Sequence, residues 1–308
     1  MIKYSFVLFT CIIAVVQLKA SAHTLYRHSL NDSTSIKIKI KSYQAFEDEY
    51  PLTWYQMITD IPKDDYLFLR NNITAPKVSA YLSIAALTGA FMSVDKSGWK
   101  YDKKLYHTSY LFRNTSNVLV FFGDGISHYI ISGLFAAYGF AEQDPSALRT
   151  ASNLIEAELS AGLLVQILKR ITGRESPASS DKSLGSWKFF PSIREYQKDQ
   201  PKYYSFPSGH LAAATAMLTV IANDNPQCTW IRPAGYCALG LLGVSLVSQG
   251  MHWYSDLPLG FFIGYSIGNI VAPEIKTNKD NNAAKVSNFI LAPSIGFNNI
   301  GFNLSCTF

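Results

Sequence analysis

The sequence predicts an all-α fold: a bundle of about six helices embedded in a membrane, with a small polar N-terminal segment and a C-terminal tail that resembles a β-hairpin. Hydrophobic residues make up 48% of the 308 residues, and charged residues only 16%. After Pro76, apolar stretches of helical length follow one another with few charges. The mean hydropathy of +0.07 is high for a soluble enzyme and low for a protein made mostly of membrane helices, so a soluble bundle stays open as the alternative.

Residues 1–22 have the pattern of a secretory signal peptide. Lys3 is followed by an apolar stretch and then by Ala20-Ser-Ala22, the small-residue triplet that precedes a cleavage site. The apolar stretch is short for a membrane span, which needs roughly 20 residues, although an uncleaved first helix is the alternative. We therefore expect export from the cytoplasm.

Residues 23–76 form the polar N-terminal segment. Isoleucine and lysine alternate from Ser35 to Lys41, which predicts a short half-buried strand. The lysine face of this strand indicates either a solvated edge strand or a surface that contacts anionic lipid headgroups.

Residues 77–275 form the predicted helical core. Closely spaced Gly, Ser and Ala residues in these stretches permit tight packing of helix against helix. The predicted helices, each short for a bilayer span, cover residues 78–94, 125–141, 150–170, 209–223, 234–251 and 257–272.

Residues 276–308 form a linker and a tail. The linker is polar, and residues 286–308 have the pattern of a hairpin with its turn at Asn298-Asn299. We expect the tail to pack on the bundle, because one hairpin cannot close a membrane barrel.

Charge and cysteine content exclude two classes of site. The net charge of +5 is mild and the chain has no long basic run, so we expect no nucleic-acid partner. Removal of the leader leaves Cys228, Cys237 and Cys306, without a Cys-x-x-Cys pair that would indicate a zinc site. A bridge between Cys228 and Cys237 and a pair of free thiols are both possible.

The first chemical motif is Pro207-Ser208-Gly209-His210. Ser208 has the position of an N-cap, and the residues after it form helices well. The unpaired N–H groups and the positive dipole end of that helix suit an anion such as phosphate. Gly209 lets a ligand approach the backbone, and His210 places an imidazole beside it.

The second motif contains His252 and Asp256. Their spacing places both on one face if a helix runs through them, so that the carboxylate fixes the tautomer of the imidazole and leaves the other nitrogen as nucleophile or base. A purely structural histidine–carboxylate pair has the same spacing.

The third motif lies around the end of the helix predicted at 150–170. Lys169 and Arg170 complement the dipole at a helix C-terminus, and Arg174 follows in the next loop. That loop continues to the Pro-Ser-Gly-His turn and is long enough to suggest that it faces the substrate.

Together these motifs resemble the type 2 phosphatidic acid phosphatase superfamily, which includes bacterial class A acid phosphatases and vanadium haloperoxidases. The family pattern is Lys-x6-Arg-Pro, then Pro-Ser-Gly-His, then Ser-Arg-x5-His-x3-Asp. This chain has the three parts in the same order: Lys169-x6-Ser176-Pro177, Pro207-Ser208-Gly209-His210, and Ser245-Leu246-x5-His252-x3-Asp256. The resemblance covers roughly residues 78–272.

The resemblance implies a role for each matching residue. His252 would attack phosphorus and form a phosphohistidine, Asp256 would orient it, and His210 would protonate the leaving oxygen. Lys169, Ser208 and the Gly209 N–H would hold the phosphate oxygens. The resemblance implies no metal and no other cofactor.

The chain departs from the family pattern at two arginines, which normally contact the phosphate. Ser176 and Leu246 stand in their places. Arg174 is the first candidate to replace them as a phosphate ligand and Lys202 is the second, although Arg174 also has the pattern of a solvated loop residue. Loss of both arginines without replacement would slow the reaction by several orders of magnitude.

These expectations define a leading function and its alternatives. The leading one is a phosphatase that acts on a phosphorylated lipid at the periplasmic face of a bacterial inner membrane. The alternatives are a soluble periplasmic acid phosphatase and an anion-binding member without turnover, while haloperoxidase chemistry ranks last because the missing arginines would weaken the hold on vanadate. The pattern predicts neither the lipid nor the oligomeric state.

Overall fold

The computed structural model describes residues 55–72, 78–182, 184–273, 288–296 and 299–307. The leader predicted at 1–22 and the strand predicted from Ser35 to Lys41 lie outside this part of the chain. The chain divides into two units, Met1–Pro273 and Glu274–Phe308.

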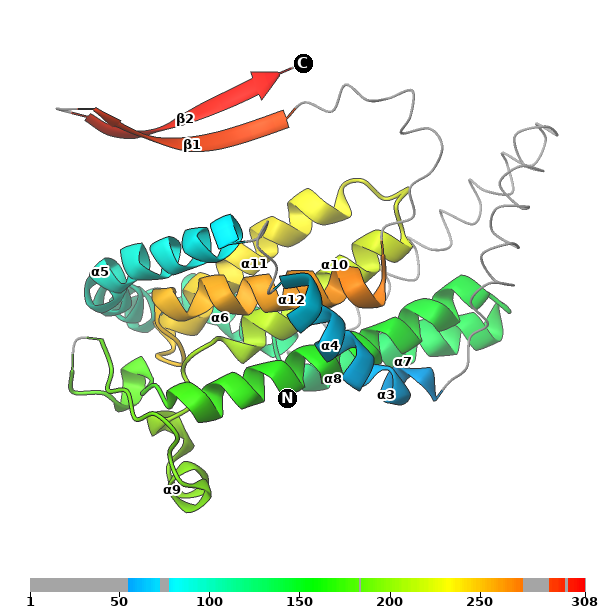
Figure 1. The fold of residues 1–308 in the computed structure, drawn as a ribbon, viewed down its shortest axis with the longest axis horizontal. Coiled ribbons are helices and arrows are strands. Elements are labelled where there is room, and N and C mark those ends of the chain that lie inside the picture. Colours follow the sequence, from blue (N-terminus) through cyan, green and yellow to red (C-terminus); the bar gives the residue numbers. More distant parts are fainter. Residues whose placement is uncertain (1–54, 73–77, 183, 274–287, 297–298, 308) are drawn as a thin grey trace. The chain divides into compact units, whose positions relative to one another are not determined.

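The first unit is helical, as Figure 1 shows, and the predicted all-α class is confirmed. Its α-helices are α3 (Gln56–Thr59), α4 (Ile61–Asn72), α5 (Val78–Thr108), α6 (Tyr110–Phe122), α7 (Gly125–Ala141), α8 (Pro145–Thr172), α9 (Ile193–Lys198), α10 (Gly209–Asp224), α11 (Ile231–Ser248) and α12 (Leu257–Val271). Short 3₁₀ turns η2 (Pro177–Ser179), η3 (Gln200–Lys202) and η4 (Tyr254–Asp256) lie in the loops.

The core lies where α10 packs against both α8 and α12. Small residues line these contacts, among them Ala157 of α8 and Ala216 of α10, both fully buried. At Gly264 of α12 an added Cβ would lie 2.1 Å from the carbonyl oxygen of Ala212, so only glycine permits this approach of the two backbones. The close helix packing predicted from the small residues is therefore present.

Helix α8 has well-defined signals at both ends. The Asp144 side chain accepts hydrogen bonds from the first turn, and Pro145 occupies the first helical position, where no backbone donor is needed. Gly173 ends the helix in the left-handed conformation, with φ of 50°, and its N–H bonds to the carbonyl of Lys169. This ending fixes where the chain leaves α8 and enters the long loop.

Two helices, α8 and α11, are long and apolar enough to cross a membrane. The pair α6 and α7 meets the same criterion as one bent span, with an angle of 63° between its halves. Large apolar side chains are also exposed on the helical surface, such as Leu111 on α6, Phe140 on α7 and Leu241 on α11. The described helices therefore have the composition of a membrane-embedded bundle.

The helix bounds differ from the predictions in several places. Helix α5 continues to Thr108, well past the predicted end at residue 94, because its polar C-terminal half buries Asp95 and Asp102 against the rest of the unit. The predicted helix at 234–251 ends at Ser248, and Gly250 then turns the chain with φ of 73°. Helices α3, α4, α6 and α9 were not predicted: α3 and α9 are short, α4 is polar, and polar residues 113–117 interrupt the apolar residues of α6.

The second unit contains the predicted hairpin. Strand β1 (Asn288–Gly296) pairs antiparallel with β2 (Asn299–Thr307), from Asn288 opposite Thr307 to Gly296 opposite Asn299. Asn299 is thus the first residue of β2, and the turn predicted at Asn298-Asn299 is wrong by one position.

Candidate active site

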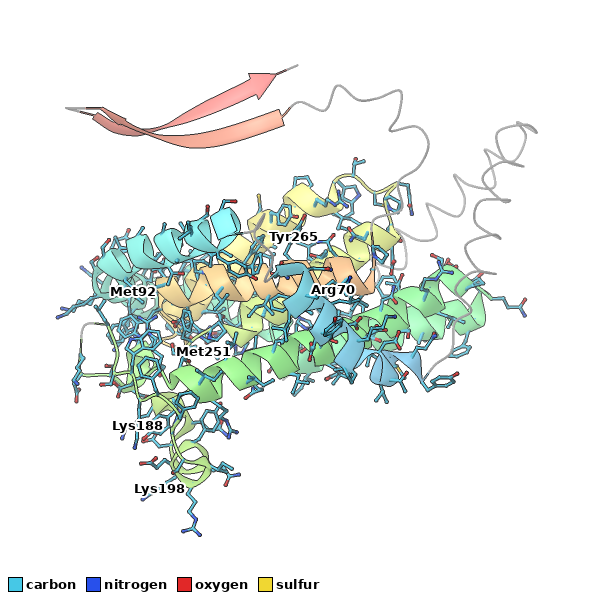
Figure 2. All side chains as sticks on the ribbon, in the orientation of Figure 1. Arg70, Met92, Lys188, Lys198, Met251 and Tyr265 are labelled. Carbon is cyan, nitrogen blue, oxygen red and sulfur yellow. The ribbon has the colours of Figure 1, made fainter. Side chains whose placement is uncertain are left out.

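Three chain segments meet at one end of the bundle and bring the predicted site residues together. They are the C-terminal end of α8, the N-terminal end of α10 and the loop between α11 and α12. Met251, labelled in Figure 2, belongs to that loop and precedes His252.

His252 is fully buried, and its two ring nitrogens have different surroundings. Nδ1 lies 2.7 Å from the backbone carbonyl oxygen of Ser205. Because a carbonyl only accepts hydrogen bonds, Nδ1 carries the proton and Nε2 presents its lone pair. Within the described part of the chain, Nε2 has no hydrogen-bond partner. The imidazole is therefore held as a neutral tautomer with a free basic nitrogen.

Asp256 supports His252 indirectly. Its Oδ2 lies 3.7 Å from Nδ1 of His252, which is too long for a hydrogen bond. That oxygen accepts instead from the Ser205 hydroxyl at 2.5 Å and from the Trp253 N–H at 2.7 Å. Asp256 thus fixes Ser205, whose carbonyl holds the imidazole. The predicted orienting effect passes through Ser205, and no α-helix runs through both residues, since they lie in a loop and in η4.

Arg174 does not lie where it was predicted. It is fully buried, so it is not a solvated loop residue. All five N–H groups of its guanidinium donate hydrogen bonds inside the protein. Two go to the carbonyl of Leu184, and one each goes to Ser255 Oγ, Asp256 Oδ1 and Asp95 Oδ2. The structure therefore places Arg174 behind Asp256 and not among the groups that face a phosphate.

Helix α5 provides the support behind this arginine. Asp95 is fully buried, and its carboxylate also accepts from the Ser255 N–H at 3.0 Å and from the Ser255 hydroxyl at 2.5 Å. One turn further along α5, Gly98 leaves room for Tyr254, whose hydroxyl donates to Asp102 at 2.5 Å. The turn that contains Asp256 is thus fastened to α5 at several points.

The N-terminus of α10 forms the opposite side of the site. Ser208 is the predicted N-cap, because its side-chain oxygen accepts from the Leu211 N–H at 3.4 Å. An added Cβ on Gly209 would lie 3.4 Å from Nζ of Lys169, so the ammonium sits directly against the open backbone of this turn. Lys169 is only 6% exposed, and its Nζ also lies 5.1 Å from the centre of the Tyr204 ring. Together the ammonium and the helix end make this side of the site, called the recess below, electropositive.

His210 faces His252 across this recess. The two ring centroids are 5.8 Å apart, with an angle of 71° between the ring planes. His210 lies in the first turn of α10, outside the candidate spans. Burial, followed by the charges of His252 and Lys169, lowers the pKa of His210 to about 3. Without an anion in the recess, His210 is therefore neutral at pH 7.

Burial also lowers the pKa of His252 below its ordinary value. The nearby Asp256 carboxylate opposes this shift, and the charge of Lys169 adds to it. A neutral imidazole is the form that has a nucleophilic lone pair.

Ser176 and Leu246, which stand in the places of the family arginines, bring no positive charge to the recess. Ser176 is buried in the loop after α8, and its hydroxyl lies 3.4 Å from that of Ser179. Leu246 belongs to an apolar cluster with Leu211 and Leu242. Lys202 is half exposed and pairs with Asp199 at 2.9 Å, so the structure does not bring it to the site.

Several contributors were not predicted from the sequence. Asp95 lies just past an uncharged run, and a single carboxylate at that place in a helix is a usable signal of a buried polar role. His128 interrupts another apolar run in the same way; it is buried, with Nδ1 2.8 Å from Glu158 Oε2 and Nε2 2.9 Å from the carbonyl of Phe122. Tyr204 and Ser205 carry no such signal.

In the described ranges, no group of three or more His, Cys, Asp or Glu side chains is arranged to hold a metal ion. Cys228 and Cys237 are both free thiols.

Comparison with known proteins shows what the region of these motifs is similar to. Residues 150–280 match the sequence model of the PAP2 superfamily. A segment of 67 residues is 33% identical to the lipid A 1-phosphatase of Porphyromonas gingivalis; it covers 21% of this chain and 15% of that relative.

Two solved structures resemble the fold. One is the transmembrane PAP2-type phosphatidylglycerolphosphate phosphatase from Bacillus subtilis, with a TM-score of 0.45, 18% identity, and coverage of 68% of this chain and 96% of that one. The other is LpxE of Aquifex aeolicus, with a TM-score of 0.40, 20% identity, and coverage of 56% and 92%.

All three motifs, from Lys169 to Asp256, lie inside the matched region, and the resemblance that they carry is confirmed. Through residues 150–280, the chain resembles the PAP2 superfamily.

Proposed function

We propose that this protein is a phosphatase that hydrolyses the phosphomonoester or pyrophosphate of a lipid through a phosphohistidine. The observation that carries the proposal is the buried Nε2 of His252, which has no partner in the described residues, on a ring whose centroid lies 5.8 Å from that of His210. An unsatisfied buried polar atom lowers stability, and it is explained here by a ligand that uses it.

The first step transfers the phosphoryl group to His252. The Nε2 lone pair attacks phosphorus, an N–P bond forms, and the P–O bond to the lipid breaks. Ser205 keeps the Nδ1 proton in place, so that the positive charge that develops on the imidazole is stabilised by a hydrogen bond. The lipid alkoxide takes its proton from His210.

The second step returns His252 to its starting state. A water molecule attacks phosphorus and gives a proton to His210, and the N–P bond breaks to release inorganic phosphate. Throughout both steps, Lys169, the Ser208 hydroxyl and the N–H groups at the start of α10 stabilise the negative charge on the phosphate oxygens.

Substrate binding favours the protonation of His210 that the first step requires. The lowered pKa of His210 keeps it neutral in the empty recess. A phosphate dianion brings negative charge next to the ring, which raises that pKa and favours uptake of a proton. We therefore expect phosphate binding to be coupled to protonation of His210.

The proposed location is a membrane with the site on the extracytoplasmic side. The candidate spans support the membrane, and the leader pattern at 1–22 supports the sidedness. We propose that residues 23–76 form an N-terminal segment, 77–275 the catalytic core and 276–308 a linker and tail. The lipid A 1-phosphatase among the compared proteins favours a lipid phosphate as substrate.

A second candidate function is anion binding without turnover. It is favoured by one observation: neither Ser176 nor Leu246 carries the family's charge, and Arg174 is engaged elsewhere. Only Lys169 and the end of α10 then provide positive charge for the phosphate.

The test is phosphate release by the purified full chain in detergent. The substrates are phosphatidate, phosphatidylglycerophosphate, a polyprenyl pyrophosphate and lipid A, and the wild type is expected to hydrolyse at least one. His252→Ala is expected to abolish release, and ³²P-labelled substrate is expected to leave an acid-labile, base-stable label on the wild type only. Lys202→Ala is the matched control and is expected to keep full activity.

Each outcome decides between the candidates. Phosphate binding without release from any lipid supports the second function. Release that survives in His252→Ala contradicts the phosphohistidine mechanism.

A further inference from the structure

The loop between α8 and α10 exposes an unusual group of large apolar side chains. Phe189 is 64% exposed, Phe190 is 73% exposed, and Ile193 at the start of α9 is 65% exposed. A neighbour of Phe189, Trp187, stacks on it with ring centroids 6.2 Å apart. Clustered exposed apolar groups of this size mark an interaction surface.

The base of this segment is firmly attached to the bundle. The Lys188 N–H donates to the carbonyl of Gly173 at 3.0 Å, and the Phe190 N–H donates to the carbonyl of Ile171 at 3.1 Å. On the inner side of α9, Tyr196 is buried with the Arg170 guanidinium 3.8 Å from its ring centre. The exposure of Phe189 and Phe190 therefore belongs to a folded loop.

Phe190 also has a backbone conformation that its side chain disfavours. Its φ is 52°, in the left-handed region where an aromatic residue is uncommon and glycine is favoured. The fold would gain from glycine at this position, so the phenyl ring is explained by a contact outside the described unit.

The exposed loop lies next to the end of an apolar stripe on α8. Leu163, Ile167 and Ile171 follow one another at intervals of one turn and are 46%, 49% and 37% exposed. Helix α8 is long and apolar enough to cross a membrane, and in the proposed membrane location this stripe would face lipid. It ends at Ile171, whose carbonyl accepts the Phe190 N–H, so the exposed loop begins next to the end of the stripe.

Basic side chains lie around the apolar tip, together with Glu195, which pairs with Lys188. Figure 1 shows α9 standing apart from the packed helices, beside the end of α8 from which the loop departs. In Figure 2, Lys188 and Lys198 lie on this projecting part, and Lys198 points away from the bundle. Lys188, Arg194 and Lys198 are all exposed. Aromatic rings with adjacent lysine and arginine are typical of segments at the level of lipid headgroups.

We propose that residues 184–198 form a membrane-interface arm, in which Phe189, Phe190 and Ile193 insert among lipid acyl chains and the basic side chains contact anionic headgroups. The occupant of this surface is the bilayer in which the bundle itself sits, because the apolar stripe on α8 ends next to the arm. The proposal rests on the membrane location given under the proposed function, and it is independent of the phosphatase activity.

The arm also connects the bilayer surface to the site. Trp187 packs against Phe206, whose ring centroid lies 5.4 Å away, and it lies 4.9 Å from the guanidinium carbon of Arg174. Insertion of the arm would therefore hold the recess at the height of the headgroups, where a lipid phosphate needs to travel least to reach His252.

The first experiment measures the depth of the arm. The full chain, with its native cysteines replaced by serine, carries a fluorescent label at Phe190→Cys and is reconstituted into bilayers that contain phosphatidylglycerol. Brominated acyl chains are expected to quench this label strongly. The matched control is a label at Lys182→Cys, an exposed position just before the arm, where weak quenching is expected. Equal quenching at the two positions would overturn the proposal.

The second experiment separates the arm from the chemistry. Phe190→Gly relieves the unfavourable φ, so the melting temperature is expected to stay the same or rise. Hydrolysis of the lipid substrate in bilayers is expected to fall about tenfold, while hydrolysis of a soluble phosphomonoester is unchanged, and Phe190→Trp is expected to restore the lipid rate. Unchanged lipid hydrolysis in Phe190→Gly, or an equal loss on both substrates, would contradict the arm.

The two proposals fail separately. A wild type without phosphatase activity still gives the quenching result, and that result alone then decides on the arm. An active wild type without selective quenching at position 190 removes the arm and leaves the proposed function in place.

Discussion

The two sides of His252 differ in how completely their polar groups are satisfied. Behind Nδ1 lies a clamp, which consists of Asp95, Arg174, Ser205, Ser255 and Asp256. Every one of these residues is fully buried, and their charged groups are joined to one another by hydrogen bonds. In front of Nε2 lies the reaction face, formed by Lys169, Ser208, Gly209 and His210, where Nε2 itself has no partner among the described residues.

The difference shows which side the fold determines. Buried charges lower stability unless they are paired and hydrogen-bonded, so the clamp has one stable arrangement and holds the loop of His252 in it. The reaction face gains nothing from folding by leaving a basic nitrogen and helix N–H groups unsatisfied. Substitutions in the clamp should therefore lower stability and turnover together, while substitutions in the reaction face should change catalysis and leave the fold intact.

The largest effect is expected from Arg174→Gln. The substitution leaves the buried carboxylates of Asp95 and Asp256 without their common cation, and breaking a buried ion pair in this way costs about 3–5 kcal/mol. The melting temperature and kcat are expected to fall together. Thermal unfolding in detergent and steady-state kinetics measure both.

A contact of Arg174 with phosphate would give a different result. In that case Arg174→Gln would weaken inhibition by inorganic phosphate and leave the melting temperature unchanged, which would contradict the clamp. Lys202→Gln is the matched control, because its exposed pair with Asp199 contributes only about 0–1 kcal/mol.

The second effect concerns the charge of Asp256. In Asp256→Asn the amide oxygen still accepts a hydrogen bond, but the negative charge opposite Arg174 is lost. Since Asp256 acts on His252 through Ser205, kcat is expected to fall about a hundredfold, with a smaller change in KM. An unchanged kcat would show that the position of the imidazole does not depend on this carboxylate.

The pH profile of the same variant has a defined direction. The proposed active form of His252 is neutral, and burial lowers its pKa below the ordinary value of about 6.5. We therefore expect kcat/KM to be at its full value above the lowered pKa and to decrease as the pH falls through it. Asp256 opposes the lowering, so Asp256→Asn should move the acid limb further down. The comparison uses one substrate for both proteins, which cancels the titration of the substrate itself. A limb that moves upward would contradict the assignment to His252.

A smaller effect is expected from Ser205→Ala. The hydroxyl of Ser205 donates to the Asp256 carboxylate, and a buried hydrogen bond to a charged group contributes about 1.5–3 kcal/mol. The backbone carbonyl that holds Nδ1 is retained, so kcat should fall only about tenfold. Ser205→Thr, which keeps the hydroxyl, is the control expected to recover part of the loss.

The local structure of the reaction face could be predicted from the sequence because its signals are local. A serine before a glycine and a run of alanines is enough to predict the N-cap at Ser208 and the helix after it, and the structure confirms both. The position of Lys169 beside the start of α10 is expected from the same order of motifs. These features depend on residues close together in the chain.

The clamp was not predictable in the same way. Arg174 and Asp95 are 79 residues apart, and Asp95 lies outside the region that matches the family. Arg174 is close in sequence to Ser176, which made it the natural candidate for a phosphate ligand. Its actual direction depends on where α5 packs, and no spacing within the motifs contains that information.

The smallest effect is expected on the reaction face, from Gly209→Ala. The added Cβ would lie 3.4 Å from both Lys169 Nζ and Val165 Cγ1, so it fits with little adjustment of the flexible ammonium. Alanine also favours the helical conformation over glycine by about 0.5–1 kcal/mol, and the melting temperature should stay the same or rise. The methyl group occupies space next to the backbone N–H groups that a phosphate would approach, so KM should rise several-fold.

Gly209→Ala tests the reaction face, whereas Arg174→Gln tests the clamp. Higher KM at unchanged or higher stability is the signature expected where the fold leaves room for a ligand. Gly240→Ala on α11 is the matched control, because nothing lies within 4 Å of the Cβ that it adds. A Gly209→Ala protein that melts lower than Gly240→Ala, with an unchanged KM, would show that Gly209 serves packing and that the phosphate does not approach the start of α10.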